Sequence, residues 1–437
     1  MIKAIKPEDK VNVTLVQGYA LFSRVCDTMA RSVIYSLILS IVWILQETAG
    51  EYDGMVTIGA VGDILIHREL QVQASQSPAR FRELWKEVSS LMRSVDVAYA
   101  NMEGPMARNL VKPESLEEEC DEIQADEKLY FDGEVWTDFP YFNYHPALAE
   151  DLSRDGVDIV STANNHVMDR CAKGVNKTFD ALNKAGIAHT GTRKNENDPW
   201  HAVTKWHNMS IAWLSCTQAG NEEQMSAADR STLVLKCGDT EVISTLVRDL
   251  ASSHDLVIVT PHWGIEFEQV GVMFRRKALA WLEAGATIIL GNHPHITDGV
   301  EEYVTNDGRR TMIAYSLGNF VSHMGYGKYY QRKEKFYPRL RTSPFLLIKL
   351  ARTREGNTVL HSIRYVPLFV KRRRARPCPG CRCPQPFGET INLDLQSCPS
   401  FHVGPASNQS SAFKILQSVL PNIIPLDLNQ ALQWVHD

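Results

Sequence analysis

Residues 255–264 read DLVIVTPHWG, residues 275–285 read RRKALAWLEAG, and residues 286–295 read ATIILGNHPH. The first and third stretches are apolar runs that end in polar residues, which is typical of buried strands leading into loops. The stretch between them has helical spacing. Strand, helix and strand in this order predict two parallel strands joined by a crossover helix.

The same alternation continues outward along the chain in both directions. Further strands are expected at MVTIGAVGD (55–63), DVAYANMEG (96–104), VDIVSTANNH (157–166), SIAWLSCTQ (210–218) and TMIAYSLGNFV (311–321). Further helices are expected at FRELWKEVSSLMRSV (81–95), PALAEDLSRDG (146–156), GVNKTFDALNKAG (174–186), TEVISTLVRDLASS (240–253) and, as a short helix packing back on the domain, within 412–426. The alternation predicts an α/β fold with a largely parallel sheet. In such sheets, ligands bind outside the carboxyl ends of the strands.

The composition is that of a globular protein. The chain has 437 residues, of which 44% are hydrophobic and 22% charged, so a sizeable core is expected. The formal net charge is -5, which provides no basic field for nucleic acid. Nucleic-acid partners are therefore not expected.

The N-terminal residues 1–50 have the features of a leader. An apolar run at 33–45 follows a basic start at Met29 and precedes small residues, as in a signal peptide. The run is shorter than the about 20 residues of a membrane span. Either Met29 is the functional start or residues 1–50 act as a signal anchor, so membrane association through residues 33–45 is expected; the alternative is a buried helix. The leader predicts a secreted or membrane-anchored protein with an extracytoplasmic domain, and the alternative location is cytoplasmic.

The cysteines agree with an oxidising compartment. Nine are present, and a start at Met29 leaves eight, an even number that suits disulfides whose pairing the sequence does not reveal. The stretch KRRRARPCPGCRCPQP (371–386) is basic and rich in Cys and Pro. It is interpreted as a disulfide-tied linker, with a zinc knuckle as the alternative. The expected division is a leader at 1–50, a main domain at 51–370, and a linker with a tail at 371–437.

Polar residues cluster where the predicted strands end. Five loops end in candidate ligands: Gly62-Asp63, Asn101-Met102-Glu103-Gly104, Ala163-Asn164-Asn165-His166, Pro261-His262-Trp263-Gly264 and Gly291-Asn292-His293-Pro294-His295. Any one of them alone is more often a cap or a satisfied polar residue. Together they supply the carboxylate, carboxamide and imidazole groups that suit Mn, Zn, Fe or Mg. The sequence therefore predicts a site for one or two divalent ions.

Six segments, five of which contain these loops, resemble in order the motifs of the bacterial capsule-synthesis protein CapA family. They are GAVGDILIHREL (59–70), ANMEGP (100–105), STANNHVMD (161–169), TPHWGIEFE (260–268), LGNHPHI (290–296) and YSLGNFV (315–321). That family serves poly-γ-glutamate production and belongs to the calcineurin-like metallophosphatase superfamily. The resemblance covers roughly residues 55–370 and implies a metallophosphatase-like layered α/β sandwich.

The resemblance also implies roles for individual residues. Asp63 and His295 would bind a first metal ion, Asn165, His262 and His293 a second, and Glu103 would bridge them, while His166 would stabilise or protonate the leaving group. Candidate residues for orienting the ligands or binding substrate are His67, Glu266, Arg275 and Asn319. The superfamily's first motif carries His where this chain has Leu65, which predicts weak or absent binding of the first ion.

The function implied is that of a metal-dependent hydrolase of the CapA type. Its role would be the synthesis or processing of poly-γ-glutamate or a related anionic polymer, and its partner would be that polymer or a phosphoester. The alternative is a non-catalytic accessory protein that binds the polymer and keeps the metal site. A third interpretation is a pseudoenzyme that has lost the first ion. Family resemblance alone does not choose among these, because one fold hosts many functions.

Overall fold

The computed structural model describes residues 52–112, 120–218, 232–326, 338–373, 400–407 and 410–436. The predicted leader, the three clustered cysteines Cys378, Cys381 and Cys383, and Cys398 lie outside these residues. The chain divides into two compact units: Met55–Arg352 with Asn357–Asp437, and Met1–Gly54 with Thr353–Gly356.

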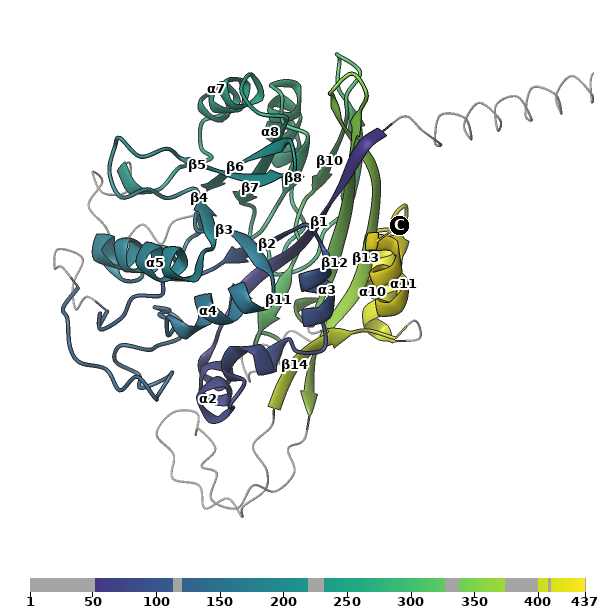
Figure 1. Ribbon diagram of the computed structural model, residues 1–437. Helices are drawn as coiled ribbons and strands as arrows, with labels where there is room; N and C mark the ends of the chain where they lie inside the picture. The colour runs from purple at the N-terminus through teal and green to yellow at the C-terminus, as the bar shows by residue number, and fades with distance from the viewer. Residues whose placement is uncertain are drawn as a thin grey trace, which may run out of the picture. The chain divides into compact units, whose positions relative to one another are not determined.

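The first unit contains two β-sheets (Figure 1). Among the described residues, one sheet has nine strands: β1 (Tyr52–Leu65), β2 (Val97–Met102), β3 (Val157–Ser161), β4 (Ala188–Thr190), β11 (Asn319–Ser322), β12 (Thr342–Thr353), β13 (Thr358–Arg373), β14 (Ser400–Pro405) and β15 (Ile424–Pro425). The other sheet has six strands within the same ranges: β5 (His201–Trp206), β6 (Met209–Thr217), β7 (Leu256–His262), β8 (Ile288–Leu290), β9 (Val300–Val304) and β10 (Arg310–Ala314).

Helices cover the outer faces of the sheets (Figure 1). On the side of the nine-stranded sheet lie α2 (Arg68–Gln76), the 3-10 helix η1 (Arg80–Leu84), α3 (Ser89–Ser94), α4 (Ala147–Arg154), α5 (Cys171–Ala185) and α11 (Leu428–His436). On the side of the six-stranded sheet lie α7 (Thr240–Ala251) and α8 (Val272–Glu283). The remaining described helical segments are the 3-10 helix η3 (Arg339–Arg341) and α10 (Ser411–Val419), which packs near β13.

Strand β6 shows why the layers stack in the order helix, sheet, sheet, helix. Successive side chains of a strand point to opposite faces. Ile211 and Trp213 belong to the core between the two sheets, whereas Ala212 and Leu214 belong to the core under α7 and α8. Both faces of the strand are therefore buried, as expected for a sheet covered on both sides. The predicted class, a layered α/β sandwich, is confirmed.

The predicted parallel strands are present, but they are divided between two sheets, each of which also contains antiparallel strands. Parallel pairing holds among β1, β2, β3 and β4 and among β6, β7, β8 and β10. Antiparallel pairs lie at one edge of the nine-stranded sheet and at both edges of the six-stranded one. The antiparallel pair β12 and β13 extends the nine-stranded sheet, and β5 and β9 flank the six-stranded one. Both are mixed sheets, with their parallel strands in the part that carries the predicted ligands.

Two predicted elements are split in the structure. The apolar stretch 311–321 forms two strands in different sheets, β10 and β11, because the chain crosses between the sheets at Tyr315–Gly318. The predicted helix at 81–95 is broken into η1 and α3. Trp85 lies at the break, where its indole nitrogen donates a hydrogen bond of 2.8 Å to the buried Asp155 Oδ2. This tertiary contact replaces continuation of the helix.

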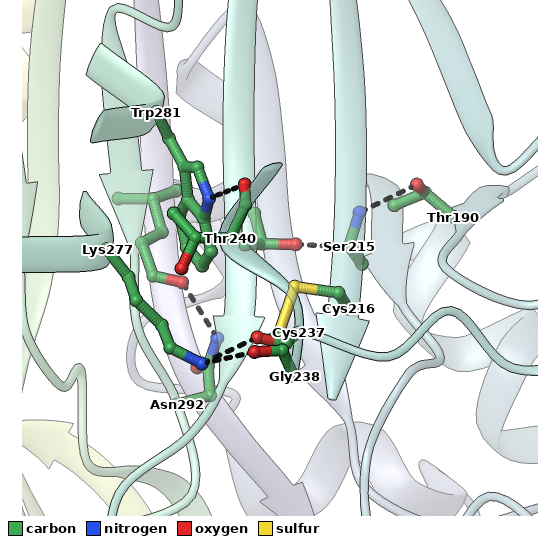
Figure 2. Close-up of a disulfide and its surroundings, with 11 residues drawn as sticks. Thr190, Ser215, Cys216, Cys237, Gly238, Thr240, Lys277, Trp281 and Asn292 are labelled. Atoms are coloured by element: carbon green, nitrogen blue, oxygen red, sulfur yellow. Dashed lines mark hydrogen bonds between the residues drawn. A yellow bond between two sulfur atoms is a disulfide. The ribbon is translucent and has the colours of Figure 1, made fainter. Parts of the chain in front are cut away.

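A disulfide joins the end of β6 to the segment before α7. Cys216 bonds Cys237, and Lys277 of α8 donates hydrogen bonds of 2.8 and 2.9 Å to the carbonyl oxygens of Cys237 and Gly238 (Figure 2). A second disulfide joins Cys120 to Cys171 at the start of α5. Within the described ranges, no helix combines the length and apolarity that crossing a membrane requires.

Candidate metal centre

The predicted ligands converge at the carboxyl ends of strands from both sheets. Asp63 lies near the end of β1, Glu103 directly follows β2, and His262 is the last residue of β7. The loop after β3 supplies Asn165, and the loop after β8 supplies His293 and His295. Parallel strands present these ends at one edge of each sheet, which is why residues far apart in sequence meet there.

Close backbone contacts fix the edge where these loops meet. Asp63 donates its backbone N–H to the Gly318 carbonyl at 2.9 Å. A Cβ on Gly62 would lie 1.8 Å from that same carbonyl oxygen, so only glycine fits there. His293 and His295 adopt φ values of 99° and 58°, a left-handed conformation that is rare for non-glycine residues. Such conformations cluster at functional sites, where the surrounding structure enforces them.

Glu103 occupies the centre of the cluster. Its side chain is fully buried, and neither carboxylate oxygen has a hydrogen-bond partner among the described residues. Its Oε1 lies 3.6 Å from Nε2 of His262 and 3.7 Å from Nε2 of His295. Burial, followed by the nearby Asp63, raises the pKa of Glu103 well above its ordinary value. A buried carboxylate without partners is costly unless a cation binds it.

His262, His293 and Asn165 form one side of the cluster. His262 Nε2 lies 3.0 Å from Nδ1 of His293 and 2.8 Å from Oδ1 of Asn165. Burial, and next the opposing histidine, lower the pKa of His262 well below its ordinary value. Burial likewise lowers the pKa of His293 to about 3. Both imidazoles are therefore neutral and able to offer a nitrogen lone pair.

His295, Asp63 and Asn319 form the other side. Asn319 donates from Nδ2 to the carbonyls of His295 and Leu340 at 3.2 and 3.0 Å, which leaves its Oδ1 as an acceptor 3.1 Å from His295 Nδ1. Asp63 Oδ2 also lies 3.1 Å from that nitrogen. Nδ1 of His295 therefore carries a hydrogen, and its Nε2 faces Glu103. Metal-binding histidines commonly donate their other ring N–H to such oxygens.

Electrostatics on this side favour positive charge. Burial lowers the pKa of His295, but the carboxylates of Glu103 and Asp63 more than offset this effect and raise the pKa to about 9. The raised pKa favours a positive charge on this imidazole beside the buried carboxyl groups of Glu103 and Asp63. A divalent cation would supply that positive charge in its place.

The side chains fit divalent ions by chemistry and by spacing. Three sets of donors have ligand atoms within 4.8 Å of one another: Glu103 with His262 and His293, Asp63 with Glu103 and His295, and Glu266 with His293 and His295. Nitrogens bound to one ion at about 2.1 Å lie roughly 3 Å apart, which matches the separation of His262 and His293. The first two sets share Glu103, as expected of a carboxylate between two ions.

His166 lies beside this cluster and is held by Asp169. Its Nδ1 lies 2.7 Å from Oδ2 of Asp169, and both residues are buried. The same Oδ2 accepts the backbone N–H of Phe142 at 2.7 Å, and the Phe142 ring meets the His166 ring edge-on at 4.7 Å. His166 also contributes to lowering the pKa of His262, which places its ring within electrostatic reach of the cluster.

The predicted substrate and orienting residues lie in different places. Glu266 and Asn319 lie at the cluster. His67 lies close by, with Nδ1 3.0 Å from the Leu65 carbonyl oxygen and its ring 5.3 Å from Phe142, but it belongs to none of the donor sets found among the described residues. Arg275 is directed to Glu301 of β9, with Nε 2.9 Å from Oε2, in an exposed ion pair. The Arg275 guanidinium, which was predicted to bind substrate, is therefore already paired with the Glu301 carboxylate.

Two buried residues that had no predicted role support the cluster. Asn101 donates from Nδ2 to Asp63 Oδ1 at 2.8 Å and lies 3.4 Å from Nδ1 of His262. Asp169 orients His166. Both lie in quoted motifs, ANMEGP and STANNHVMD. Their spacing from predicted site residues could have identified them. Asn101 is two residues before Glu103, on the same strand face. Asp169 is three residues after His166, in the turn that precedes α5.

The fold and the site together define a layered α/β protein with a candidate divalent-metal centre at the strand ends. Over residues 57–324 the sequence matches the family described as bacterial capsule synthesis protein PGA_cap. Because this match covers more than half of the 437 residues, the chain belongs to that family. The resemblance to CapA-type proteins is confirmed.

Two curated relatives carry related names. The chain is 25% identical over 277 residues to the PGA biosynthesis protein CapA of Bacillus subtilis (strain 168), covering 63% of this chain and 65% of that protein. It is 27% identical over 280 residues to the capsule biosynthesis protein CapA of Bacillus anthracis, covering 62% and 61%. The chain thus spans less than two thirds of the length of either relative.

Among solved structures, the chain is similar to the calcineurin-like phosphoesterase YfkN from Bacillus subtilis. The identity is 11%, the TM-score is 0.34, and the similarity covers 88% of this chain and 99% of that one. At this TM-score the likeness carries no argument about function.

Proposed function

We propose that the chain is a metal-dependent hydrolase of the CapA type that acts on an anionic polymer such as poly-γ-glutamate, or on a phosphoester. The carrying observation is Glu103, a buried carboxylate that has no hydrogen-bond partner among the described residues and is shared by two donor sets. A purely structural cluster would satisfy those oxygens with hydrogen bonds. The polymer is inferred from the relatives' names, which describe proteins of PGA and capsule biosynthesis.

In this proposal, one group of residues binds the metal ions and another donates a proton. Asp63, Glu103 and His295 would hold one ion, and Glu103, His262, His293 and Asn165 the other. Divalent ions in such sites supply Lewis-acid chemistry and activate water. His166 would give a proton to the leaving group as general acid, a role that often contributes about 10²–10⁴-fold. Asp169 holds the imidazole in one tautomer and orientation, with its proton on Nδ1.

A second candidate is a non-catalytic accessory protein that binds the polymer through bound ions. The observation that favours it is Leu65, a buried apolar side chain two residues after Asp63, which offers no donor to the Asp63–Glu103–His295 set. A weakly held first ion would leave a cation site suited to carboxylates but poor in hydrolysis. The relatives' names also describe biosynthesis rather than cleavage.

Metal analysis combined with assays separates the two candidates. Purified wild type, His166→Ala and the exposed control His436→Ala would be tested for metal content, hydrolysis of a phosphodiester and of poly-γ-glutamate, and polymer retention. Loss of hydrolysis in His166→Ala alone, with metal content unchanged, supports the hydrolase. Metal-loaded wild type that hydrolyses neither substrate but retains the polymer supports the accessory protein. Wild type that binds no metal contradicts both.

We also propose an extracytoplasmic location for the domain. The support is the pair of disulfides, Cys120–Cys171 and Cys216–Cys237, which persist in oxidising compartments. N-terminal sequencing of the mature protein and fractionation of cells test this proposal. A chain that begins at Met1 and is found in the cytosol with reduced cysteines would contradict it.

A further inference from the structure

Glu266 is the exposed member of the donor sets in the cluster. Its carboxylate and the ring nitrogens of His293 and His295 all come within 4.8 Å of one another. The two histidines are buried and Glu266 is exposed. Glu103, which is fully buried, shares one donor set with His293 and another with His295. Each of the two histidines therefore has a buried and an exposed carboxylate within reach of its ring nitrogens.

Main-chain hydrogen bonds hold the Glu266 segment against the histidine loop. Trp263 donates its backbone N–H to the Asn292 carbonyl at 3.1 Å, and Phe267 donates to the Pro294 carbonyl at 2.9 Å. These two bonds flank Glu266 on one side and His293 on the other. Directly after them, Glu268 donates to the Ile265 carbonyl at 3.1 Å and closes a turn. The backbone on both sides of Glu266 is therefore held by hydrogen bonds.

An ion held by His295 would have fewer protein donors than a complete coordination shell needs, so Glu266 could serve as a further ligand. Asp63, Glu103 and His295 are three donors, whereas zinc sites use four ligands and octahedral ions six. Leu65 and the other apolar residues at the end of β1 add none. An exposed carboxylate on a fixed loop can bind from the open side without the desolvation cost of a further buried charge.

We propose that Glu266 is a direct ligand, which would bind from the solvent side the ion that His295 would hold. This inference rests on the proposed function only in that the site binds divalent ions; it holds for the hydrolase and for the accessory protein alike. It makes the sequence Trp263–Phe267 part of the metal site rather than a substrate loop.

Equilibrium binding of Mn²⁺ to metal-free protein tests the assignment. Wild type, Glu266→Gln and the matched control Glu268→Gln would be titrated by calorimetry, with the bound ions followed by electron paramagnetic resonance. Glu268 is an exposed acid two residues along the same turn, so its variant loses the same charge at nearly the same place. Thermal unfolding in excess chelator checks that all three proteins fold equally.

The expected result is two ions in wild type and in Glu268→Gln. In Glu266→Gln, one ion should bind at least about tenfold more weakly, because loss even of an outer-shell partner costs about 10–100-fold. Equal affinities and equal spectra in all three proteins would overturn the assignment while leaving the proposed function intact. Wild type that binds no Mn²⁺ would overturn both.

Discussion

His262 and His293 face each other through ring nitrogens, with Nε2 of the first 3.0 Å from Nδ1 of the second. Both imidazoles have a lowered pKa, so they meet as neutral groups whose lone pairs repel unless a hydrogen or a cation lies between them. Asn165 adds an oxygen 2.8 Å from the same His262 nitrogen. Three donors from three loops, aimed at one point, are the arrangement from which the following predictions start.

Replacement of His262 by alanine should remove one bound ion. Its nitrogen is the donor common to the contacts with Asn165, His293 and Glu103. Loss of a direct ligand should weaken the binding of that ion by at least about tenfold. The other ion should be retained through Asp63, Glu103 and His295. Elemental analysis after dialysis measures the number of metal ions bound per protein molecule. Equal content in His262→Ala and the exposed control His436→Ala would count against the site.

Removal of the metal should lower thermal stability. An ion that binds only the folded protein adds about 2.7 kcal/mol to the free energy of unfolding at 100 times its dissociation constant. Without the metal, the part of the chain that the structure describes offers no hydrogen bond to the buried Glu103 carboxylate. Thermal unfolding should therefore move to higher temperature as Mn²⁺ is added to chelator-treated protein. Unfolding curves that do not respond to Mn²⁺ would contradict this.

Loss of the Cys216–Cys237 disulfide should destabilise the protein without removing the ions. The two cysteines are 21 residues apart, and a disulfide that closes a loop of about this length contributes about 3 kcal/mol. Both side chains are buried, so alanine is the suitable replacement for each. Urea unfolding of the Cys216→Ala/Cys237→Ala variant in chelator measures the loss. A change below about 0.5 kcal/mol, which is typical of neutral surface substitutions, would argue that the bond does not form.

Asp155 should be among the most sensitive positions outside the metal centre. It is buried and accepts hydrogen bonds from Arg82 at 2.8 Å, Arg93 at 2.7 Å and the Trp85 indole at 2.8 Å. Asp155→Ala leaves the buried indole donor unpaired and should cost about 3 kcal/mol in the free energy of unfolding. Asp155→Asn, which keeps an acceptor, should cost less. If the two variants unfold at the same urea concentration as wild type, the contacts do not form in solution.

His189 should make stability fall as the pH is lowered. Burial, and next the charge of Lys194, lower the pKa of His189 to about 4, below its ordinary value of 6.5, and its ring stacks on Phe179 at 4.2 Å. Between pH 6.5 and 4 the unfolded chain takes up the proton and the folded chain does not, so acid favours unfolding there. His189→Gln should unfold with a weaker pH dependence in this range. An unchanged pH profile of urea unfolding in chelator would refute the assignment.

The convergence of the candidate ligands could be predicted because their signal is local. Each lies at the end of an apolar strand. Carboxylate, carboxamide and imidazole groups that recur at successive strand ends are typical of a site for a divalent ion. The end of the helix at 171–185 could also be predicted, because glycine commonly follows the last residue of a helix. Gly186 adopts the left-handed conformation there, with φ of 73°. These features depend on residues near one another in the chain.

Features set by distant contacts could not be predicted. The partner of Arg275 is Glu301, on a strand that the sequence analysis did not identify. The split of 311–321 depends on Gly318, whose φ of 67° lets the chain change sheets within a continuous apolar run. The left-handed backbone of His293 and His295 has no sequence signal, since the surrounding loops enforce it.

A crystal structure with anomalous scattering collected at the manganese edge tests the central claim most directly. Protein crystallised with Mn²⁺ should show two anomalous peaks on either side of the Glu103 carboxylate. One peak should lie within coordinating distance of His262 and His293, and the other within that distance of Asp63 and His295. Saturating Mn²⁺ without a peak at Glu103, or with peaks confined to surface carboxylates, would contradict the account.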